Sequence, residues 1–267
     1  PLSEKEIDAV LLPCIVSLAE FVHLLPASQY DHHMGTGGLF GHSLEVAYYA
    51  VNGAKSRIFD VTESPEKAHL NRSRWILAAA LCGLVHDIGK AVTDIIVTSE
   101  SDQEVWYPRQ ETLAHWLRRK KLASYYVSWK QNRENNRHQT ASVEYAHAII
   151  PQATYSFLSA AGNIRIEQEI RDAVLNSAAS KGHPLCELLF MADVYSCKVD
   201  KERRKGIDPK SFYVSSPVAE SVVDGLRDLI KDGTWKVNEP GGRVFVTTAG
   251  CFVVWTHLDD LINRLVA

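Results

Sequence analysis

Cys82-Gly-Leu-Val-His-Asp-Ile-Gly-Lys90 is the stretch that decides the fold. His86 and Asp87 stand at the end of an apolar segment, which the sequence predicts to be a helix from about Asn71 to His86. An unpaired charge on such a segment is costly, because burial removes it from water. A divalent metal ion would satisfy an imidazole nitrogen and a carboxylate oxygen together. This stretch therefore predicts a metal site inside a helical core.

The composition is that of a globular protein. The 267 residues are 46% hydrophobic and 23% charged, enough to bury a sizeable core. No apolar run is predicted to span a membrane, and the first residues do not resemble a signal peptide. The five cysteines form neither a zinc-binding spacing nor a disulfide framework. We therefore expect a cytoplasmic protein and, because no initiator Met is present, a piece of a longer one.

Hydrophobic periodicity predicts a mainly α fold. Ser3 and Glu6 have the spacing of a capping box at the first helix. Residues 24–38 are predicted to be a loop, and residues 94–108 a short β-ribbon. The expected helices lie at about 39–55, 71–86, 111–122, 139–149, 166–180, 184–204 and 216–232.

The end of the chain changes character. Residues 234–238 and 243–246 are predicted to be short strands around a Glu-Pro-Gly-Gly turn, and Thr248 is predicted to cap a helix that ends near Leu265. We therefore expect a main domain over 1–210 and a helix–β-hairpin–helix appendage over 211–267 packed on it. The appendage is either a winged-helix-like module or a ribbon that seals the edge of the main domain.

Two further residues complete a candidate metal site. A catalytic divalent ion takes three or more protein ligands and keeps a position for water. His42 lies early in a predicted amphipathic helix, and Asp193 is an acid inside an apolar helical run. Asp193 alone would as readily be a hydrogen-bonded core acid. The four residues together, His42, His86, Asp87 and Asp193, predict one shared cation.

Their order resembles the H…HD…D signature of the HD-hydrolase superfamily over roughly residues 38–200. The resemblance implies an HD-domain helical bundle with the metal at its centre. Members with two metals carry two more His ligands, which His115 and His138 match by spacing; a basic surface that happens to contain His is the alternative. The ligand types suit one or two ions of Mn, Fe, Mg or Zn. Lys90 is a candidate catalytic residue that neutralises a phosphate oxygen, or else a solvated lysine at a helix end.

The charge distribution indicates a polyanionic partner. The net charge is −3, yet residues 115–138 contain seven Lys or Arg residues and one acid. Aromatic side chains are interspersed with these cations, which is typical of single-stranded nucleic-acid grooves. A solvated basic face with half its rings in the core is the alternative. The candidate nucleic-acid contacts are Arg118, Arg119, Lys120, Lys121, Lys130, Arg133 and Trp129.

A narrower resemblance lies in two strings, Leu24-Leu-Pro-Ala-Ser-Gln-Tyr-Asp-His-His-Met-Gly-Thr-Gly-Gly-Leu-Phe-Gly-His-Ser-Leu-Glu-Val-Ala47 and Val237-Asn-Glu-Pro-Gly-Gly-Arg-Val-Phe-Val246. Both are similar to the N-terminal domain of the MOBH class of conjugative relaxases, TraI-like proteins of mobile elements. That likeness implies an endonuclease that makes a metal-dependent nick in one DNA strand at a transfer origin. Its implied partners are single-stranded origin DNA, a coupling protein and accessory DNA-binding proteins. His32 and His33 belong to the first string, and we expect both near His42, with His33 a candidate catalytic residue.

Two other functions are compatible with the sequence. One is an HD-type phosphohydrolase acting on nucleotides or cyclic dinucleotides, although no Gly-Tyr-Pro follows His138, as the cyclic-di-GMP phosphodiesterases would require. The other is a DNA-binding module with an inert metal core. The attacking group is also open between metal-activated water and a tyrosine. The candidate tyrosines are Tyr30, Tyr48, Tyr49, Tyr125, Tyr126 and Tyr195.

Overall fold

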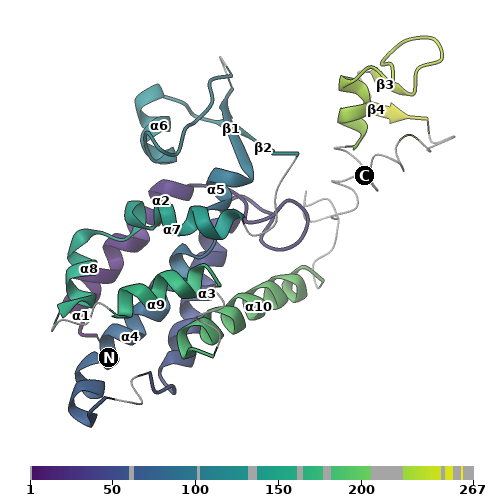
Figure 1. Ribbon diagram of the computed structural model, residues 1–267. Coiled ribbons are helices and arrows are strands. Elements are labelled where there is room, and N and C mark those ends of the chain that lie inside the picture. The colour runs from purple at the N-terminus through teal and green to yellow at the C-terminus, as the bar shows by residue number, and fades with distance from the viewer. Residues whose placement is uncertain are drawn as a thin grey trace. The chain divides into compact units, whose positions relative to one another are not determined.

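A computed structural model gives the fold (Figure 1) and describes residues 2–59, 63–100, 103–131, 137–160, 165–176, 182–205, 225–247, 250–254 and 260. The chain divides into two compact units, residues 1–206 and 207–267. Of the described residues, 61% are helical and 9% are in strands. The prediction of a mainly α fold is therefore confirmed.

Three long helices form the centre of the first unit: α3 (Gly38–Ala54), α4 (Pro65–Val85) and α10 (Pro184–Lys205). Both α3 and α10 contact α4, and they contact each other. Residues 77–85 of α4 are all buried, which explains why this helix is apolar around its whole circumference. It begins earlier than predicted because the Ser64 hydroxyl accepts a hydrogen bond from the backbone N–H of Lys67 and caps the helix there.

The remaining helices of this unit surround that centre. The predicted capping box is present, since Ser3 and Glu6 exchange side-chain and backbone hydrogen bonds. The sequence did not predict the helix that follows Pro151. These elements are α1 (Glu4–Glu6), the π-helix η1 (Ile7–Leu11), α2 (Leu12–Val22), α5 (Lys90–Thr93), α6 (Leu113–Lys120), α7 (Arg137–Ile149), α8 (Gln152–Leu158) and α9 (Arg165–Val174).

One two-stranded sheet belongs to the first unit. Strand β1 (Ile95–Ser99) pairs antiparallel with β2 (Tyr125–Trp129), with Ile95 opposite Trp129. The predicted ribbon over 94–108 is present only as a single bridge between Thr98 and Val105. The main partner of β1 is therefore a segment that the sequence did not predict to be a strand.

Helical residues 65–93 form the one stretch, within the described residues, that is long and apolar enough to cross a membrane. The most apolar 18-residue window of this stretch has a mean hydropathy of 1.5, but 78% of that window is buried inside the protein. By its length and composition alone, this helix could cross a membrane, so the expectation that no apolar run is long enough to do so is wrong. Burial is nevertheless typical of a core helix, and such a stretch is weak evidence for a membrane span.

The second unit contains helical residues 225–231 and an antiparallel pair, β3 (Val244–Thr247) with β4 (Gly250–Val253). Its described core is Leu229, Trp235 and Val244. The predicted helix after Thr248 is wrong over residues 250–253, where the cross-strand pair Phe245–Phe252 favours a strand. The predicted first strand contributes only one parallel bridge, from Val237 to Val244.

Candidate metal centre

Three helices bring four side chains to one place. His42 lies on α3, His86 and Asp87 follow the end of α4, and Asp193 lies on α10. Nε2 of His42 is 3.2 Å from Nε2 of His86 and 3.2 Å from Oδ1 of Asp193. Oδ2 of Asp87 is 3.5 Å from each of the two Nε2 atoms. The four side chains thus meet as the sequence predicts, and their binding of a metal stays a prediction.

The separations suit a divalent cation. Two donors held about 2.1 Å from one ion lie about 3.0 Å apart in an octahedral site and about 3.4 Å apart in a tetrahedral site. Nε2 of His42, Nε2 of His86 and Oδ1 of Asp193 are 3.2 to 3.9 Å apart, and Oδ2 of Asp87 is 3.5 Å from both imidazole nitrogens. Imidazole nitrogens together with carboxylate oxygens are suitable ligands for Mn, Fe or Zn. The residues therefore fit such an ion after contraction by less than about 1 Å.

Hydrogen bonds on the far side of each imidazole orient it. Nδ1 of His86 donates to the carbonyl oxygen of Gly83 at 2.9 Å. Nδ1 of His42 lies 3.1 Å from Oγ of Ser196, whose hydroxyl donates to Oε2 of Glu45 at 3.0 Å. Because that hydroxyl has one proton, the His42 ring is the donor to Ser196. Both rings therefore direct Nε2 towards the same point, the arrangement expected of ligating histidines.

Electrostatics favour a positive charge inside this cluster. Burial alone lowers the pKa of His42, but hydrogen bonds with Asp193 and Asp87 outweigh burial and raise that pKa to about 9. Burial tends to raise the pKa of Asp87, yet the neighbouring ammonium group of Lys90 holds it well below its usual value. Burial also lowers the pKa of His86, so this ring is neutral. In the metal-free protein the proton on His42 supplies the charge that a metal ion would supply.

Glycines and a buried serine fix the backbone around the cluster. A Cβ on Gly83 would lie 2.3 Å from the backbone nitrogen of Ala47, so α3 and α4 are in backbone contact here. A Cβ on Gly89 would lie 2.0 Å from a backbone oxygen of α7. The hydroxyl of Ser142 donates to the carbonyl oxygen of His86 at 2.7 Å and accepts from the backbone N–H of Gly89 at 2.9 Å. These contacts hold the His-Asp turn against α7.

The two candidate catalytic residues lie beside the cluster. Nζ of Lys90 is 2.5 Å from Oδ2 of Asp87, and burial of the ammonium group is offset by this contact, so its pKa is raised. The ring of His33 has its centroid 4.9 Å from that of His42, and its Nε2 is 3.3 Å from Oε2 of Glu45. His138, on α7, is closer to the cluster than its basic sequence context suggests, with Nε2 3.6 Å from Oδ1 of Asp87.

Comparison with known families agrees with the sequence resemblance. The family model TraI_2, which has the description "Putative helicase" and represents TraI-like conjugative relaxases, matches residues 1–267. The chain belongs to the TraI_2 family. Membership indicates a DNA-processing protein of conjugation with a relaxase- or helicase-like function. No curated protein matches the sequence.

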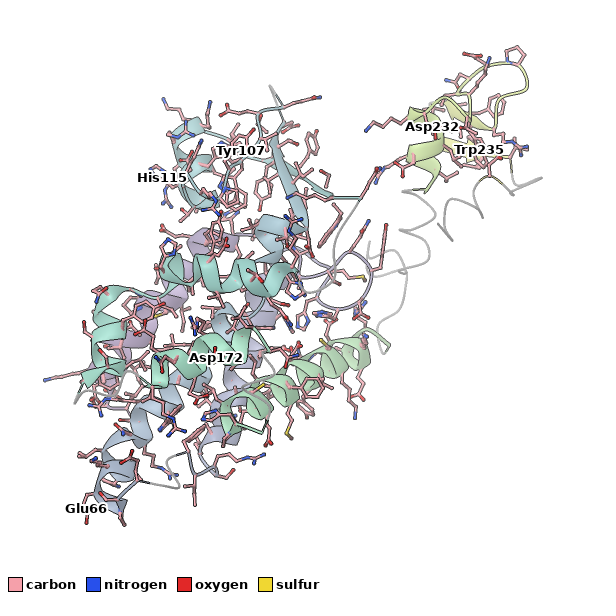
Figure 2. All side chains as sticks on the ribbon, viewed as in Figure 1. Glu66, Tyr107, His115, Asp172, Asp232 and Trp235 are labelled. Carbon is pink, nitrogen blue, oxygen red and sulfur yellow. The ribbon has the colours of Figure 1, made fainter. Side chains whose placement is uncertain are left out.

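Some predicted site residues of this TraI_2 protein do not reach the cluster. His115 lies on α6 at the surface (Figure 2), with its side chain 58% exposed and its Nδ1 2.7 Å from Oε2 of Glu111. It belongs to neither group of potential metal ligands among the described residues. Spacing gives the order of the ligands along the chain but not the direction of a side chain, so we leave His115 out of the site.

Most of the predicted nucleic-acid contacts already have partners. On α6, acids neutralise three successive cations: Arg118 pairs with Glu20, Arg119 with Glu111 and Lys120 with Glu104. Nζ of Lys130 donates to the carbonyl oxygen of Val92 at 2.8 Å, and Trp129 is half-buried at the end of β2. Lys121 ends α6 in a left-handed conformation, and Arg133 lies outside the described residues. Nucleic-acid binding by these residues stays a prediction.

Sequence reasoning missed the residues that orient and flank the cluster. Glu45 follows His42 by three positions, and Ser196 follows Asp193 by three, so each lies on the same helix face as its ligand. Cys197 is one helical turn beyond Asp193, and its thiol donates to Oδ1 of Asp193 at 3.5 Å. Helical spacing from the predicted ligands would have found all three.

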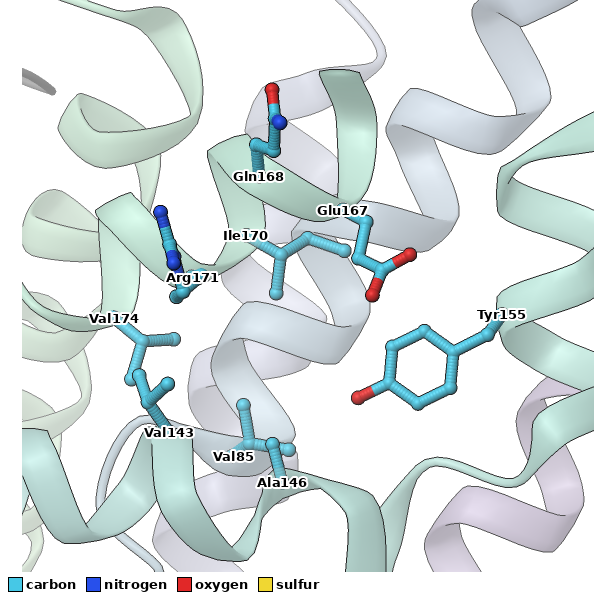
Figure 3. Close-up of a pocket in the computed structure, with 9 residues that line it drawn as sticks. All are labelled: Val85, Val143, Ala146, Tyr155, Glu167, Gln168, Ile170, Arg171 and Val174. Atoms are coloured by element: carbon cyan, nitrogen blue, oxygen red, sulfur yellow. The ribbon is translucent and has the colours of Figure 1, made fainter. Parts of the chain in front are cut away.

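A cavity of about 410 Å³ lies between α4, α7, α8 and α9 (Figure 3). Apolar side chains form part of its walls, and its polar lining residues are Tyr155, Glu167, Gln168 and Arg171. None of the four clustered ligands lines it. The cavity is therefore separate from the candidate metal centre.

Proposed function

We propose that this TraI_2 chain is a metal-dependent relaxase that nicks one DNA strand at a transfer origin. The proposal depends chiefly on the convergence of His42, His86 and Asp193, with Asp87 beside both imidazoles and both rings oriented through Nδ1. Family membership supports a role in conjugative DNA processing. A buried helical core has no need of two imidazoles and two carboxylates in contact, and a cation explains why they are there.

The four ligands would hold a divalent ion, which supplies polarisation of a phosphodiester oxygen and a lower pKa for a coordinated water. Lys90 is the cation beside Asp87, so its ammonium group is placed to bind a non-bridging phosphate oxygen. His42 is wholly buried, whereas the side chain of Asp193 is 39% exposed. DNA would therefore approach the cluster from the side of Asp193.

Phosphodiester cleavage accounts for the site better than nucleotide-driven strand separation. A helicase motor needs a Gly-x-x-x-x-Gly-Lys-Ser/Thr loop to hold ATP phosphates, and the 267 residues contain no such pattern. Gly89-Lys90 is the one Gly-Lys pair, and Ala91 follows it. We therefore propose strand cleavage, and not ATP-driven strand separation, as the reaction of this site.

The test is a nicking assay with labelled origin oligonucleotides and manganese. His86→Gln and Asp87→Asn should each abolish nicking and lower the bound metal, while His69→Gln, on the exposed part of α4, should retain both. Wild-type nicking in either cluster variant would overturn the assignment. Hydrolysis of free nucleotides without DNA nicking would also overturn it, in favour of a small-molecule phosphohydrolase.

The fate of the cut strand decides the attacking group. A label that stays attached to denatured protein indicates a tyrosine nucleophile, and free ends indicate attack by water. Tyr49 lies on α3 with His42, and Tyr195 lies on α10 with Asp193. The rings of these two tyrosines are in contact, with centroids 4.7 Å apart. They are the first tyrosines to replace by Phe if the label stays attached.

A further inference from the structure

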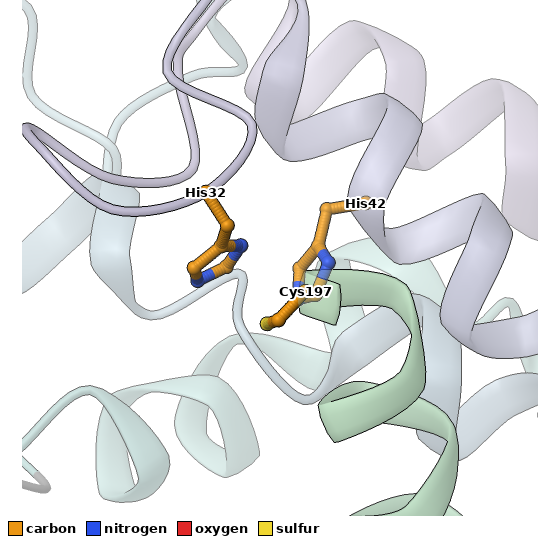
Figure 4. A group of neighbouring side chains, drawn as sticks. All are labelled: His32, His42 and Cys197. Carbon is orange, nitrogen blue, oxygen red and sulfur yellow. The ribbon is translucent and has the colours of Figure 1, made fainter. Parts of the chain in front are cut away.

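A second group of ligand-type side chains adjoins the cluster, and of its members only His42 takes part in the function proposed above. His32 lies on the loop between α2 and α3, His42 on α3 and Cys197 on α10, and their side chains face one another (Figure 4). One ligand atom of each lies within 4.8 Å of the other two. The ring centroids of His32 and His42 are 4.6 Å apart. This group shares only His42 with the candidate metal centre.

The loop is built to hold His32 in this position. The hydroxyl of Ser28 accepts from the backbone N–H of His32 and donates to its carbonyl oxygen, at 2.9 and 2.7 Å. The backbone N–H of Ala27 donates to the carbonyl oxygen of His33 at 3.0 Å, and Gly38 leaves no room for a Cβ against that same oxygen. The loop backbone is thus fixed on both sides of a side chain that is 8% exposed.

Structural hydrogen bonding does not explain the position of the His32 ring. Among the described residues, the ring of His32 has one long nitrogen contact, 3.4 Å from its Nδ1 to Nδ1 of His33. The buried ring faces a thiol and a second imidazole, and these ligand types together suit a thiophilic metal such as zinc.

We propose that His32, His42 and Cys197 form a second cation position, selective for a soft divalent ion such as Zn²⁺, that cannot be filled together with the centre containing His86 and Asp193. Nδ1 of His42 is committed to Ser196, which leaves Nε2 for either position. One Nε2 lone pair binds one ion. The two positions are therefore alternatives, and zinc withdraws His42 from the centre.

The ligand types give the selectivity. Zinc binds thiolate sulfur at about 2.3 Å and imidazole nitrogen at about 2.0 Å, which places tetrahedral ligands about 3.3 to 3.5 Å apart. Ligand atoms within 4.8 Å of one another reach that spacing by small side-chain rotations. Binding forms the Zn–S bond and a Zn–N bond to Nε2 of His42, and it releases the thiol proton of Cys197 and the Nε2 proton of His42 to solvent. Manganese and magnesium favour oxygen donors and gain little from sulfur.

Cobalt(II) is the probe, because only a thiolate ligand gives it a sulfur-to-cobalt charge-transfer band. The full chain should show this band. Cys197→Ser and His32→Gln should lose it, while His86→Gln and the matched control Cys186→Ser, also on α10, should keep it. A band that persists in Cys197→Ser, or no band in the wild type, would overturn the site.

Displacement tests the exclusion. Manganese that is bound to the wild-type chain does not contribute to the electron paramagnetic resonance signal of the free ion. One equivalent of zinc should release the manganese, and the free-ion signal should then appear. Zinc that binds while manganese stays bound would overturn the exclusion. Zinc inhibition of nicking follows only if the proposed relaxase activity is correct. The two metal assays use no DNA, so their failure is distinguishable from failure of the proposed function.

Discussion

Replacing Ser196 by Ala removes the hydroxyl that connects His42 to Glu45. In the wild type the His42 ring donates to Ser196 over 3.1 Å, and Ser196 donates to Glu45 over 3.0 Å. The variant leaves a wholly buried N–H without an acceptor, which costs about 1–3 kcal/mol of the free energy of unfolding. It also releases the ring from the tautomer that directs Nε2 to the metal. Loss of such a supporting contact lowers metal affinity about 10- to 100-fold, or about 1.4–2.7 kcal/mol.

Calorimetric titration of the metal-free chain with manganese measures this change, and urea unfolding measures the loss of stability. Ser159→Ala is the matched control, because that hydroxyl donates to the carbonyl oxygen of Tyr155 on α8 and does not contact the cluster. The control should keep the manganese affinity. A wild-type manganese Kd in folded Ser196→Ala would refute the idea that second-layer hydrogen bonds orient His42.

Three further predictions concern protonation, packing and DNA binding. The pKa of His42 in the metal-free protein is raised from 6.5 to about 9, so its contribution to stability is full below pH 6.5 and is lost as the pH rises through about 9. Manganese affinity rises over the same interval, because the ion displaces that proton; titrations in buffers of different ionisation enthalpy measure the proton release, and a pH-independent Kd would contradict it. Gly83→Ala puts a Cβ 2.3 Å from the backbone of α3 and lowers the free energy of unfolding by about 1–3 kcal/mol, whereas Gly35→Ala, with nothing within 4 Å, does so much less; equal urea midpoints would argue against tight contact. Lys121→Gln reduces the salt slope of single-stranded DNA binding by about 0.7, and Arg118→Gln, already ion-paired, by less; no change in either would mean that α6 is only a solvated face.

Local patterns predict the helices that carry the site. The expected helices at 39–55 and 184–204 are observed as α3 and α10. Apolar residues recur at helical spacing in both, and residues that favour a boundary, glycines before α3 and Pro184 in α10, mark where they begin. The pairing of β1 with β2 is different. Its partner strands are about 30 residues apart in the chain and are joined through α6, so no short window of sequence contains the pair.

The sequence predicted which residues form the cluster and their order along the chain. It did not predict the residues that orient and flank them. His42, His86, Asp87 and Asp193 each interrupt an apolar helical pattern, and a polar residue there needs a partner. His115 met the same spacing argument, yet its ring points to Glu111 and solvent. The direction of a side chain depends on how helices pack, and one sequence does not contain that information.

Anomalous scattering at the manganese edge, from crystals of the full chain grown with manganese, tests the central claim most directly. The account predicts one strong peak at about 2.0–2.2 Å from Nε2 of His42, Nε2 of His86 and a carboxylate oxygen of Asp87 or Asp193. A saturated crystal whose ion lies elsewhere, with these four side chains still hydrogen-bonded to one another, would contradict it.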